Sequence, residues 1–493
     1  MWTKQTLRET IASRMEGYKL IIASNRQPFH HMLKAGKLIC QREPGGVVTA
    51  LHPVMQASSG TWIAAASTDY DRQTVDSQNK VKVPPDNPAY TLRRLFIPKM
   101  ERDAYYFGYA NQGLWPLCHI VYTRPVFRQA EWEAYQRVNR IFAQAIMEEA
   151  AGEKAFVWAH DFHLALVAQY LKEMGCQNIV TSLFWHIPWP NPEVFRICPQ
   201  KKEILEGLLA YDLLGFQIRY HADNFFKSVD SELESRIDRE TDTVNYQNRQ
   251  TLIRAFPISV DFDGIGKKTE IPAAQAAMER LKEELDLGGR KLILGIDRID
   301  YTKGLPEKVR AIDRFLEKYP DYKQKFVFLQ IGQISRLHVQ RYKQLNDELN
   351  GLVEEVNWKH AEDSWKPVHL TRAYFSYDDI LVLYRMADIC IVSSLHDGMN
   401  LVAKEFVSAR TDESGVLMLS SFTGAARELT DALLMNPYDI ESFADTLAQG
   451  LVMPEEEKQK RMRKMREAVS SRNIYHWAGK VLSQLLRFEF QEV

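Results

Sequence analysis

The chain has 493 residues, which is enough for two or three domains of ordinary size. Apolar residues make up 45% of it and charged residues 26%, and 63 Lys and Arg stand against 64 Asp and Glu. The resulting net charge of −1 argues against a chain that mainly coats nucleic acid or an anionic membrane surface. Its longest apolar runs have the length of strands, far short of the ~20 residues that a membrane-spanning helix needs.

The N-terminal residues and the cysteines indicate the cellular location of the protein. The N-terminal residues carry charges throughout and lack the apolar segment that a signal peptide requires. The five cysteines are scattered, without a C-x-x-C pair, at Cys40, Cys118, Cys176, Cys198 and Cys390. We therefore expect reduced thiols in a cytoplasmic protein, with neither a disulfide framework nor a zinc site.

The first half of the chain predicts helices and strands in alternation. Leu7, Ile11 and Met15 recur at helical spacing and predict an N-terminal helix that packs on the first domain or on a partner. Residues 19–23 (KLIIA) predict a strand that ends in the loop SNRQPF. Residues 155–159 (AFVWA) predict another strand, which leads through HDFH into an amphipathic helix.

The second half repeats the same unit. Apolar runs at residues 291–296, 326–331, 389–392 and 415–419 each precede a polar or glycine-containing loop, and most of these loops lead into a helix. Strands that are almost continuously apolar and alternate with helices are typical of a parallel sheet covered on both faces. The chain is therefore predicted to be an α/β protein.

A break in this pattern indicates a domain boundary. Residues 256–268 (FPISVDFDGIGKK) interrupt it, so we expect two doubly wound domains, residues 1–255 and 256–474, with a cleft between them. An apolar terminal helix, residues 475–493, is expected to cross back to the first domain. Because ligands of open α/β sheets bind beyond the carboxyl ends of the strands, the loops at those ends are the candidate site.

The loop SSLHDGMNLVAKEF, residues 393–406, follows a buried strand and opens a helix. Its backbone N–H groups suit an anion such as a diphosphate, and the carboxylate of Glu405 suits a ribose. An ordinary strand–turn–helix with Asp397 as the cap remains an alternative. A G-x-G-x-x-G fingerprint is missing, which disfavours a nicotinamide cofactor. The candidate amides belong to Gly398, Met399, Asn400 and Leu401.

Two cations lie on the loop DRIDYTKGLPEK. Arg298 and Lys303 follow a strand and suit a leaving diphosphate whose negative charge grows during bond cleavage. As an alternative, both are solvated side chains of a surface loop, which is the commoner fate of Arg and Lys.

Two further readings are disfavoured. His160, Asp161 and His163 could ligate a metal, but His-x-x-His at a strand end is not the i, i+4 helical arrangement of a zinc protease, and no further strong ligand stands at a familiar spacing. Residues 261–264 (DFDG) resemble the opening of aspartate-nucleophile phosphatases but lack the sequel of that motif. The Pro-rich HIPWPNP is better explained as a rigid turn that holds His186 at the cleft.

Together these loops resemble glycosyltransferase family 20, and within it the enzymes that make trehalose 6-phosphate. The resemblance rests on an ordered series of motifs over nearly the whole chain. The motifs are SNR (24–26), PGG (44–46), YYFGYANQGLWPLCH (105–119), HDFHL (160–164), HIPWPNPEVF (186–195), YDLLGFQ (211–217), FPI (256–258), DRIDYTKGLPEK (297–308), SR (335–336), DGMNLVAKEF (397–406) and NPYD (436–439).

The resemblance implies a GT-B fold, in which two Rossmann-like domains face each other across a cleft. It implies a retaining transfer of glucose from a nucleotide-glucose donor to glucose 6-phosphate, with neither a metal ion nor a cofactor. The acceptor hydroxyl would attack from the face that the diphosphate leaves, with a β-phosphate oxygen as base. The expected partners are these small molecules, with neither nucleic acid nor a membrane, and the oligomeric state, including a homo-oligomer, stays open.

The resemblance also implies roles for individual residues. Arg298 and Lys303 would hold the diphosphate, assisted by Gly46 and the amides of residues 398–401, and Glu405 would bind the ribose. Asp397 and His186 would contact the transferred glucosyl group. Phe375 would lie beside the base. The acceptor site would comprise Arg26 and Arg336 on the phosphate, with Tyr106, Trp115 and Asp161 lining the pocket.

Departures from the family pattern leave the substrates open. His396 stands where Arg is usual, Ser393 and Ser394 replace Thr-Pro, Ile334 replaces a more polar residue, and residues 60–71 lack a second Trp. The donor base is therefore uridine, adenosine or guanosine, and glycerol 3-phosphate is an alternative acceptor. A non-catalytic regulatory protein is a second alternative. A GT-B epimerase is disfavoured because its extra acid–base carboxylates are missing.

Overall fold

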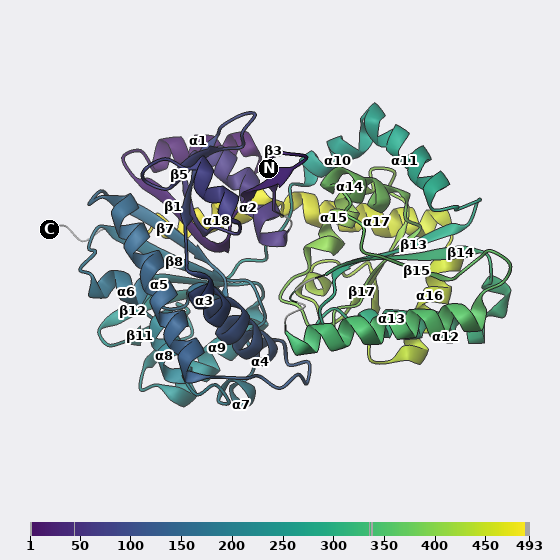
Figure 1. Ribbon diagram of the computed structural model, residues 1–493. Helices are drawn as coiled ribbons and strands as arrows, with labels where there is room; N and C mark the ends of the chain where they lie inside the picture. The colour runs from purple at the N-terminus through teal and green to yellow at the C-terminus, as the bar shows by residue number, and fades with distance from the viewer. Residues whose placement is uncertain (1, 44, 335, 337–338, 489–493) are drawn as a thin grey trace. The chain divides into compact units, whose positions relative to one another are not determined.

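The computed structural model describes residues 2–43, 45–334, 336 and 339–488. Pro44 of the PGG motif, Ser335 of the SR motif and the last residues of the predicted terminal helix therefore lie outside the described residues. Contacts divide the chain into two compact units (Figure 1). The first comprises Met1–Ile258 together with Ile474–Val493, and the second comprises Ser259–Asn473.

A ten-stranded sheet is the frame of the first unit. Its strands are β1 (Lys19–Arg26), β4 (Thr61–Ala65), β5 (Lys80–Val83), β6 (Tyr90–Leu95), β7 (Ala155–His160), β8 (Ile179–Trp185), β9 (Leu213–Phe216), β10 (Arg236–Asp238), β11 (Thr243–Tyr246) and β12 (Arg249–Ala255). They lie in the order β10-β11-β12-β9-β8-β7-β1-β4-β6-β5, and those from β12 to β6 run parallel. Strands β2 (Phe29–Lys34) and β3 (Lys37–Arg42) form a separate antiparallel hairpin.

Helices from both ends of the chain pack together in the first unit. The C-terminal helix α18 contacts α1, α2, β8 and β9, and Figure 1 shows it in yellow beside the purple α1 and α2. Leu7 on α1 is fully buried, so the predicted N-terminal helix packs on its own unit. The helices are α1 (Lys4–Arg14), α2 (Gly46–Ser58), α3 (Lys99–Arg102), α4 (Trp115–His119), α5 (Gln129–Ala150), α6 (Val167–Glu173), α7 (Pro192–Phe195), α8 (Lys201–Leu208), α9 (Arg219–Glu232) and α18 (Ile474–Leu485), with the 3-10 helices η1 (Asp69–Thr74) and η3 (Phe162–Leu164) and the π-helix η2 (Asp103–Leu114).

The second unit carries a six-stranded sheet whose neighbours all pair in parallel, in the order β15-β14-β13-β16-β17-β18. In Figure 1 helices α12 and α13 lie below this sheet and α14 and α15 lie above it, which confirms the predicted parallel sheet with two covered faces. The strands are β13 (Lys291–Arg298), β14 (Phe326–Gln333), β15 (Val368–Thr371), β16 (Ile389–Val392), β17 (Val416–Ser420) and β18 (Leu433–Met435). The helices are α10 (Phe262–Glu270), α11 (Pro272–Glu284), α12 (Leu305–Lys318), α13 (Gln340–His360), α14 (Tyr377–Met386), α15 (Leu401–Ala409), α16 (Ile440–Val452) and α17 (Glu455–Ser471), with η4 (Pro320–Tyr322) and η5 (Gly424–Arg427).

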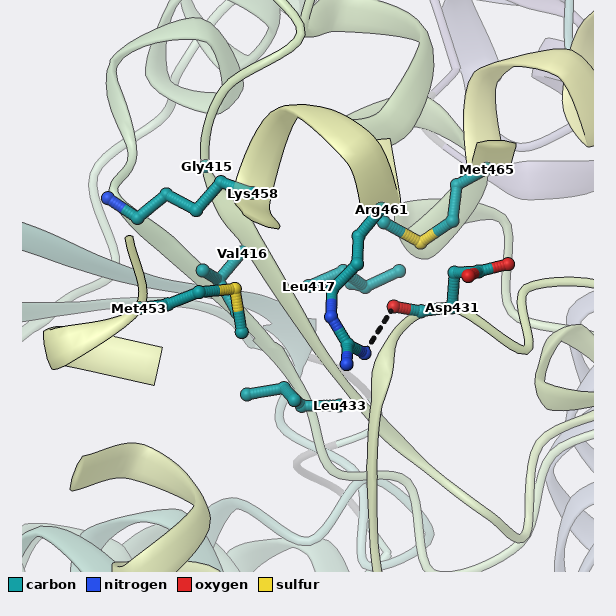
Figure 2. A pocket seen from close by; sticks show the side chains of 9 residues that line it. All are labelled: Gly415, Val416, Leu417, Asp431, Leu433, Met453, Lys458, Arg461 and Met465. Carbon is teal, nitrogen blue, oxygen red and sulfur yellow. Dashed lines mark hydrogen bonds between the residues drawn. The ribbon is translucent and has the colours of Figure 1, made fainter. Parts of the chain in front are cut away.

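A small pocket lies at the amino-terminal ends of β17 and β18, below α17 (Figure 2). The Arg461 guanidinium donates a hydrogen bond to the Asp431 carbonyl across it, at 3.1 Å. Its volume of about 10 Å³ is room for a single water. Because ligands of such sheets bind at the carboxyl ends, this pocket belongs to the packing of the unit.

Among the described residues, no helix is both long and apolar enough to cross a membrane.

Candidate active site

Two loops at the carboxyl edge of the second sheet are joined to each other. The Leu395 amide donates to the Thr302 carbonyl at 2.8 Å, and the Ser393 hydroxyl donates to the Gly304 carbonyl at 2.9 Å. Gly304 has φ +63°, and a Cβ there would lie 2.3 Å from the Ser393 carbonyl oxygen. Only glycine therefore allows the loop after β13 to approach the loop after β16 so closely.

This approach brings Lys303 to Asp397. The lysine Nζ lies 2.6 Å from Asp397 Oδ2, and the lysine side chain is 14% exposed. The same oxygen accepts hydrogen bonds from Ser394 Oγ and Asn400 Nδ2, each at 3.2 Å. The alternative that Lys303 is a solvated surface side chain is wrong, because the lysine is mostly buried and charge-paired.

Asn400 shapes the start of α15. It has φ +85°, a backbone conformation that Asn tolerates better than most residues, and its Oδ1 accepts the Ala403 amide at 3.2 Å. The alternative that Asp397 caps this helix is wrong, because Asn400 is the N-cap and Asp397 faces Lys303. No other described residue accepts a hydrogen bond from the amides of residues 398–401, so these donors can bind an anion.

A buried acid organises the cations beside this loop. Asp300 is fully buried and accepts hydrogen bonds from the Thr302 amide at 3.1 Å and from the Tyr342 hydroxyl at 3.2 Å. Arg298 and Arg336 approach the same carboxylate, at 3.8 and 3.5 Å. Burial raises the pKa of Asp300, but three nearby cations outweigh it and hold the pKa below its usual range. The carboxylate thus stays charged and orients both arginines.

The two other residues of the second unit that are predicted to contact the nucleotide of the donor lie on or next to neighbouring helices. Glu405 on α15 is 8% exposed, and its Oε2 accepts a hydrogen bond from the Tyr384 hydroxyl at 3.3 Å. Phe375 is half-buried in the loop between β15 and α14, next to Ser376, which caps α14. Glu405 is therefore held from α14, and Phe375 directly precedes the start of that helix.

In the first unit, Arg26 ends β1 and reaches two other elements. Its Nη2 donates to the Tyr106 hydroxyl at 3.3 Å, and a Cβ on Gly45 would lie 3.7 Å from its Nη1. Gly45 is the N-cap of α2 without a side-chain cap, so Gly46 begins a helix whose first amides suit an anion. The guanidinium therefore lies beside a helix N-terminus.

Tyr106 lies on η2, a π-helix, a class often found at functional sites. Its ring stacks on His163, with centroids 5.4 Å apart. Trp115 follows η2 and packs on Phe162, with centroids 5.8 Å apart. The HDFH segment therefore brings both predicted aromatic residues to the end of β7.

Asp161 and His186 are neighbours at the ends of β7 and β8. Asp161 has φ +75°, and its Oδ1 accepts the Phe162 amide at 3.0 Å and the His186 amide at 3.3 Å. His186 Nε2 lies 3.0 Å from His160 Nδ1. Burial lowers the pKa of His186 to about 3, so its ring is neutral at physiological pH. Within the described residues, no three His, Cys, Asp or Glu side chains gather in the way that a metal site requires.

The predicted residues thus form two groups. The first unit brings together Arg26, Tyr106, Asp161 and His186, with Gly46 and Trp115 close to them in the fold; the second contains Arg298, Lys303, Arg336, Phe375, Asp397, residues 398–401 and Glu405. Arg336, predicted to bind the same phosphate as Arg26, belongs to the second unit, on the carboxylate of Asp300. The phosphatase interpretation of residues 261–264 is wrong, because Asp261 caps α10 by accepting the Gly264 amide.

Two residues of the candidate site, Asp300 and Tyr342, had no predicted role, and His160 had a different one. Asp300 stands between Arg298 and Lys303 in sequence, and an acid between two cations was a usable signal. Tyr342 lies on α13, with no local motif to mark it. His160 was considered only as a metal ligand, and the structure pairs it with His186 instead.

Comparisons with known proteins identify the family of this chain. A family model described as glycosyltransferase family 20 matches residues 18–487. The chain belongs to glycosyltransferase family 20. It is a glycosyltransferase, and its family membership confirms the resemblance seen in the motifs.

Two curated relatives in this family align over nearly their whole length. The α,α-trehalose-phosphate synthase (UDP-forming) 2 of Aspergillus niger is 32% identical over 479 residues, covering 96% of this chain and 98% of the relative. The trehalose-6-phosphate synthase of Mycolicibacterium vanbaalenii is 34% identical over 481 residues, covering 96% of this chain and 97% of the relative.

Solved structures of the family share the fold. A structure described as trehalose-6-phosphate from E. coli bound with UDP-2-fluoro glucose has a TM-score of 0.85 at 30% identity, covering 96% of this chain and all of that one. An α,α-trehalose-phosphate synthase (UDP-forming) of Burkholderia xenovorans, in complex with glucose-6-phosphate, has a TM-score of 0.84 at 31% identity, covering 95% of this chain and all of that one. The fold is therefore GT-B, with two Rossmann-like domains.

Proposed function

We propose that this glycosyltransferase is a trehalose-6-phosphate synthase that transfers glucose from UDP-glucose to glucose 6-phosphate with retention of configuration. The observation that carries the proposal is the joined pair of loops in the second unit. There Lys303, paired with Asp397 at 2.6 Å, stands beside Arg298 and the uncommitted amides of residues 398–401. This is a site for a diphosphate leaving group.

The donor chemistry follows from charge. As the glycosidic bond to the diphosphate breaks, negative charge grows on the leaving oxygens, and preorganised cations and amides stabilise that charge most in the transition state. We assign this role to Arg298 and Lys303, assisted by Gly46, and the ribose to Glu405, with Phe375 beside the base. Asp397 and His186 bind the glucosyl hydroxyls. Because the two cations supply the positive charge, the transfer needs neither a metal ion nor a cofactor.

The acceptor chemistry follows from the arginines. Arg26 and Arg336 suit a phosphate because guanidinium groups bind its oxygens in pairs. Tyr106, Trp115 and Asp161 line the sugar pocket, where a carboxylate accepts hydroxyl protons and a ring packs on an apolar sugar face. The acceptor hydroxyl attacks from the face that the diphosphate leaves, and a β-phosphate oxygen takes its proton. The relatives named UDP-forming, and the one solved with glucose-6-phosphate, support these substrates.

We place the reaction in the cytoplasm, a location that the five free thiols support.

The test is nucleoside diphosphate release with UDP-, ADP- and GDP-glucose, each offered with glucose 6-phosphate or with glycerol 3-phosphate. We expect release with UDP-glucose and glucose 6-phosphate, and its loss in Arg298→Ala. Release only with glycerol 3-phosphate would overturn the proposed acceptor. A folded protein that releases nothing with any pair would overturn the proposed function and favour a non-catalytic role.

A further inference from the structure

His160, which is fully buried, and His186, which is half-buried, form a pair at the ends of two adjacent parallel strands. His160 is the last residue of β7, His186 follows β8, and the strand register pairs His160 with Phe184. The two rings meet through His160 Nδ1 and His186 Nε2, which lie 3.0 Å apart. One nitrogen must donate and the other accept, so the pair has two arrangements when both rings are neutral.

The surroundings of His160 are apolar and aromatic. Its side chain has no exposed surface and packs against the rings of Trp158 and Trp477, with centroids at 4.9 and 6.3 Å. Its Nε2 is buried and has no hydrogen-bond partner among the described residues. Burial lowers the pKa of both histidines well below the usual range, so the pair carries no charge at physiological pH.

This environment selects one arrangement. If His186 donated from Nε2, the proton of His160 would have to sit on its own Nε2, leaving a buried N–H without an acceptor, which proteins rarely contain. If His160 donates from Nδ1, its Nε2 carries only a lone pair. His186 then accepts at Nε2 and carries its own proton on Nδ1.

The backbone of His186 is fixed as well. Its amide donates to Asp161 Oδ1 at 3.3 Å, and its carbonyl accepts the Gln217 side-chain amide at 3.3 Å. No other described residue hydrogen-bonds to His186 Nδ1, and the side chain is only half-buried. A ligand can therefore reach this nitrogen.

We propose that His160 is a positioning residue that holds His186 in its Nδ1–H tautomer, so that His186 presents a neutral hydrogen-bond donor to a sugar hydroxyl oxygen. The inference rests on the proposed function for the identity of that ligand. The tautomer itself is a property of the protein without substrate and can be measured separately. His160 itself touches no substrate in this account.

The experiment compares two nearly isosteric variants. Asn carries its amide nitrogen at the position of His Nδ1, so His160→Asn keeps the donor, whereas His160→Leu removes it. His52→Leu is the control, since His52 is also buried in the first unit but bonds to Tyr90 instead. The readouts are the side-chain ¹⁵N NMR shifts of His186, assigned with His186→Gln, and kcat with UDP-glucose and glucose 6-phosphate.

We expect a protonated Nδ1 on His186 in the wild type, in His52→Leu and in His160→Asn, and a shift toward protonated Nε2 in His160→Leu. We expect kcat to fall about tenfold in His160→Leu, the effect of one ordinary hydrogen bond, and about threefold or less in His160→Asn. A wild-type His186 protonated at Nε2 overturns the inference even if neither variant folds, and so does an unchanged tautomer in His160→Leu. A protein with the expected tautomer but no glucosyl transfer overturns the proposed function and leaves the positioning role standing.

Discussion

At the scale of single residues, the site depends on charges that hold one another. Lys303 pairs with Asp397, and the buried carboxylate of Asp300 pairs with Arg298 and Arg336. A cation held this way needs little reorganisation when a diphosphate charge develops, which is the condition under which fixed charges contribute most to catalysis.

Removing one of these cations tests their role. We expect Lys303→Ala to lower kcat by about 10²–10³, the range for losing one preorganised donor at a developing negative charge. Lys343→Ala, an exposed lysine on α13, is the matched control and keeps full activity. Steady-state kinetics on proteins checked for equal thermal stability measures the difference. A Lys303→Ala enzyme within threefold of the control would exclude a leaving-group role.

Sequence reasoning at this scale selected candidate residues at the ends of predicted strands and in the loops that follow them. Arg298, Lys303 and the amides of residues 398–401 were predicted because the carboxyl ends of parallel strands gather at one edge. Tyr342 could not be predicted, because it reaches Asp300 from a helix far along the chain. The sequence could not predict which ring nitrogen of His186 is protonated or which residue caps α15. Backbone geometry decides that Asn400, and not Asp397, is the N-cap.

At the scale of elements, two tight contacts shape the loops. One is the approach of the loop after β13 to that after β16 at Gly304. The other is the ion pair of Asp71 and Arg94, which are both fully buried and lie 3.2 Å apart. Both side chains also hydrogen-bond to the backbone of β2, so the pair holds the β2–β3 hairpin to the first sheet. In each contact, the identity of one or two residues determines where a whole loop or hairpin lies.

Gly304→Ala tests the first contact. Both Gly304 and Gly289 have positive φ, but a Cβ on Gly289 meets nothing within 4 Å, whereas one on Gly304 meets the Ser393 carbonyl. We expect Gly289→Ala to lower the free energy of unfolding by about 1–2 kcal/mol, the cost of the left-handed conformation. Gly304→Ala should cost more and also lower kcat, since it pushes Lys303 away from Asp397. Equal effects of the two substitutions in urea unfolding would contradict this account.

The second contact predicts a pH dependence. Burial alone would raise the pKa of Asp71, but hydrogen bonds from its neighbours and the charge of Arg94 hold it well below its usual range. A depressed folded-state pKa stabilises the fold above the unfolded value of about 3.9, and the stabilisation is lost as the pH falls below it. The gap in unfolding free energy between wild type and Asp71→Asn should therefore be largest near pH 7 and shrink toward pH 3. A gap independent of pH would show that the Asp71 charge does not matter.

At the scale of elements, sequence reasoning worked best where residues typical of turns and helix caps mark the end of one element and the start of the next. The strand at residues 389–392 and the helix after DGMN were predicted because an apolar run ends in Ser, Asp and Gly before a helical period begins. The β1 strand runs past the predicted residue 23 to Arg26 because β4 and β7 pair with it on both sides. The π-helix η2 was not predicted, because π-helical segments are rare in proteins.

At the scale of the whole molecule, α18 contributes to the core of the first unit although it follows the second unit in sequence. Trp477 is 2% exposed, packs against Trp158 with centroids 4.8 Å apart, and donates from its indole N–H to the Phe256 carbonyl at 3.2 Å. This hydrogen bond joins α18 to Phe256, the residue that directly follows β12 and lies 221 positions earlier in the chain. The core of the first unit is therefore completed by a helix that follows the second unit in sequence.

Two substitutions of Trp477 separate packing from hydrogen bonding. We expect Trp477→Ala to lower the free energy of unfolding of the first unit by about 3–5 kcal/mol, the usual cost of emptying a buried aromatic site. Trp477→Phe fills most of the space and loses the hydrogen bond, so it should cost clearly less. Urea unfolding followed by a probe within the first unit measures both. Comparable losses in the two variants would mean that the bond to Phe256, rather than packing, is decisive.

The most direct test of the account is the structure of the product formed from UDP-glucose and glucose 6-phosphate. The account predicts a disaccharide phosphate in which ¹H NMR shows both anomeric centres in the α configuration, formed about 10²–10³-fold more slowly by Lys303→Ala. A β linkage formed from the α-linked donor would contradict retention, and free glucose as the sole product would contradict transfer to a phosphorylated sugar.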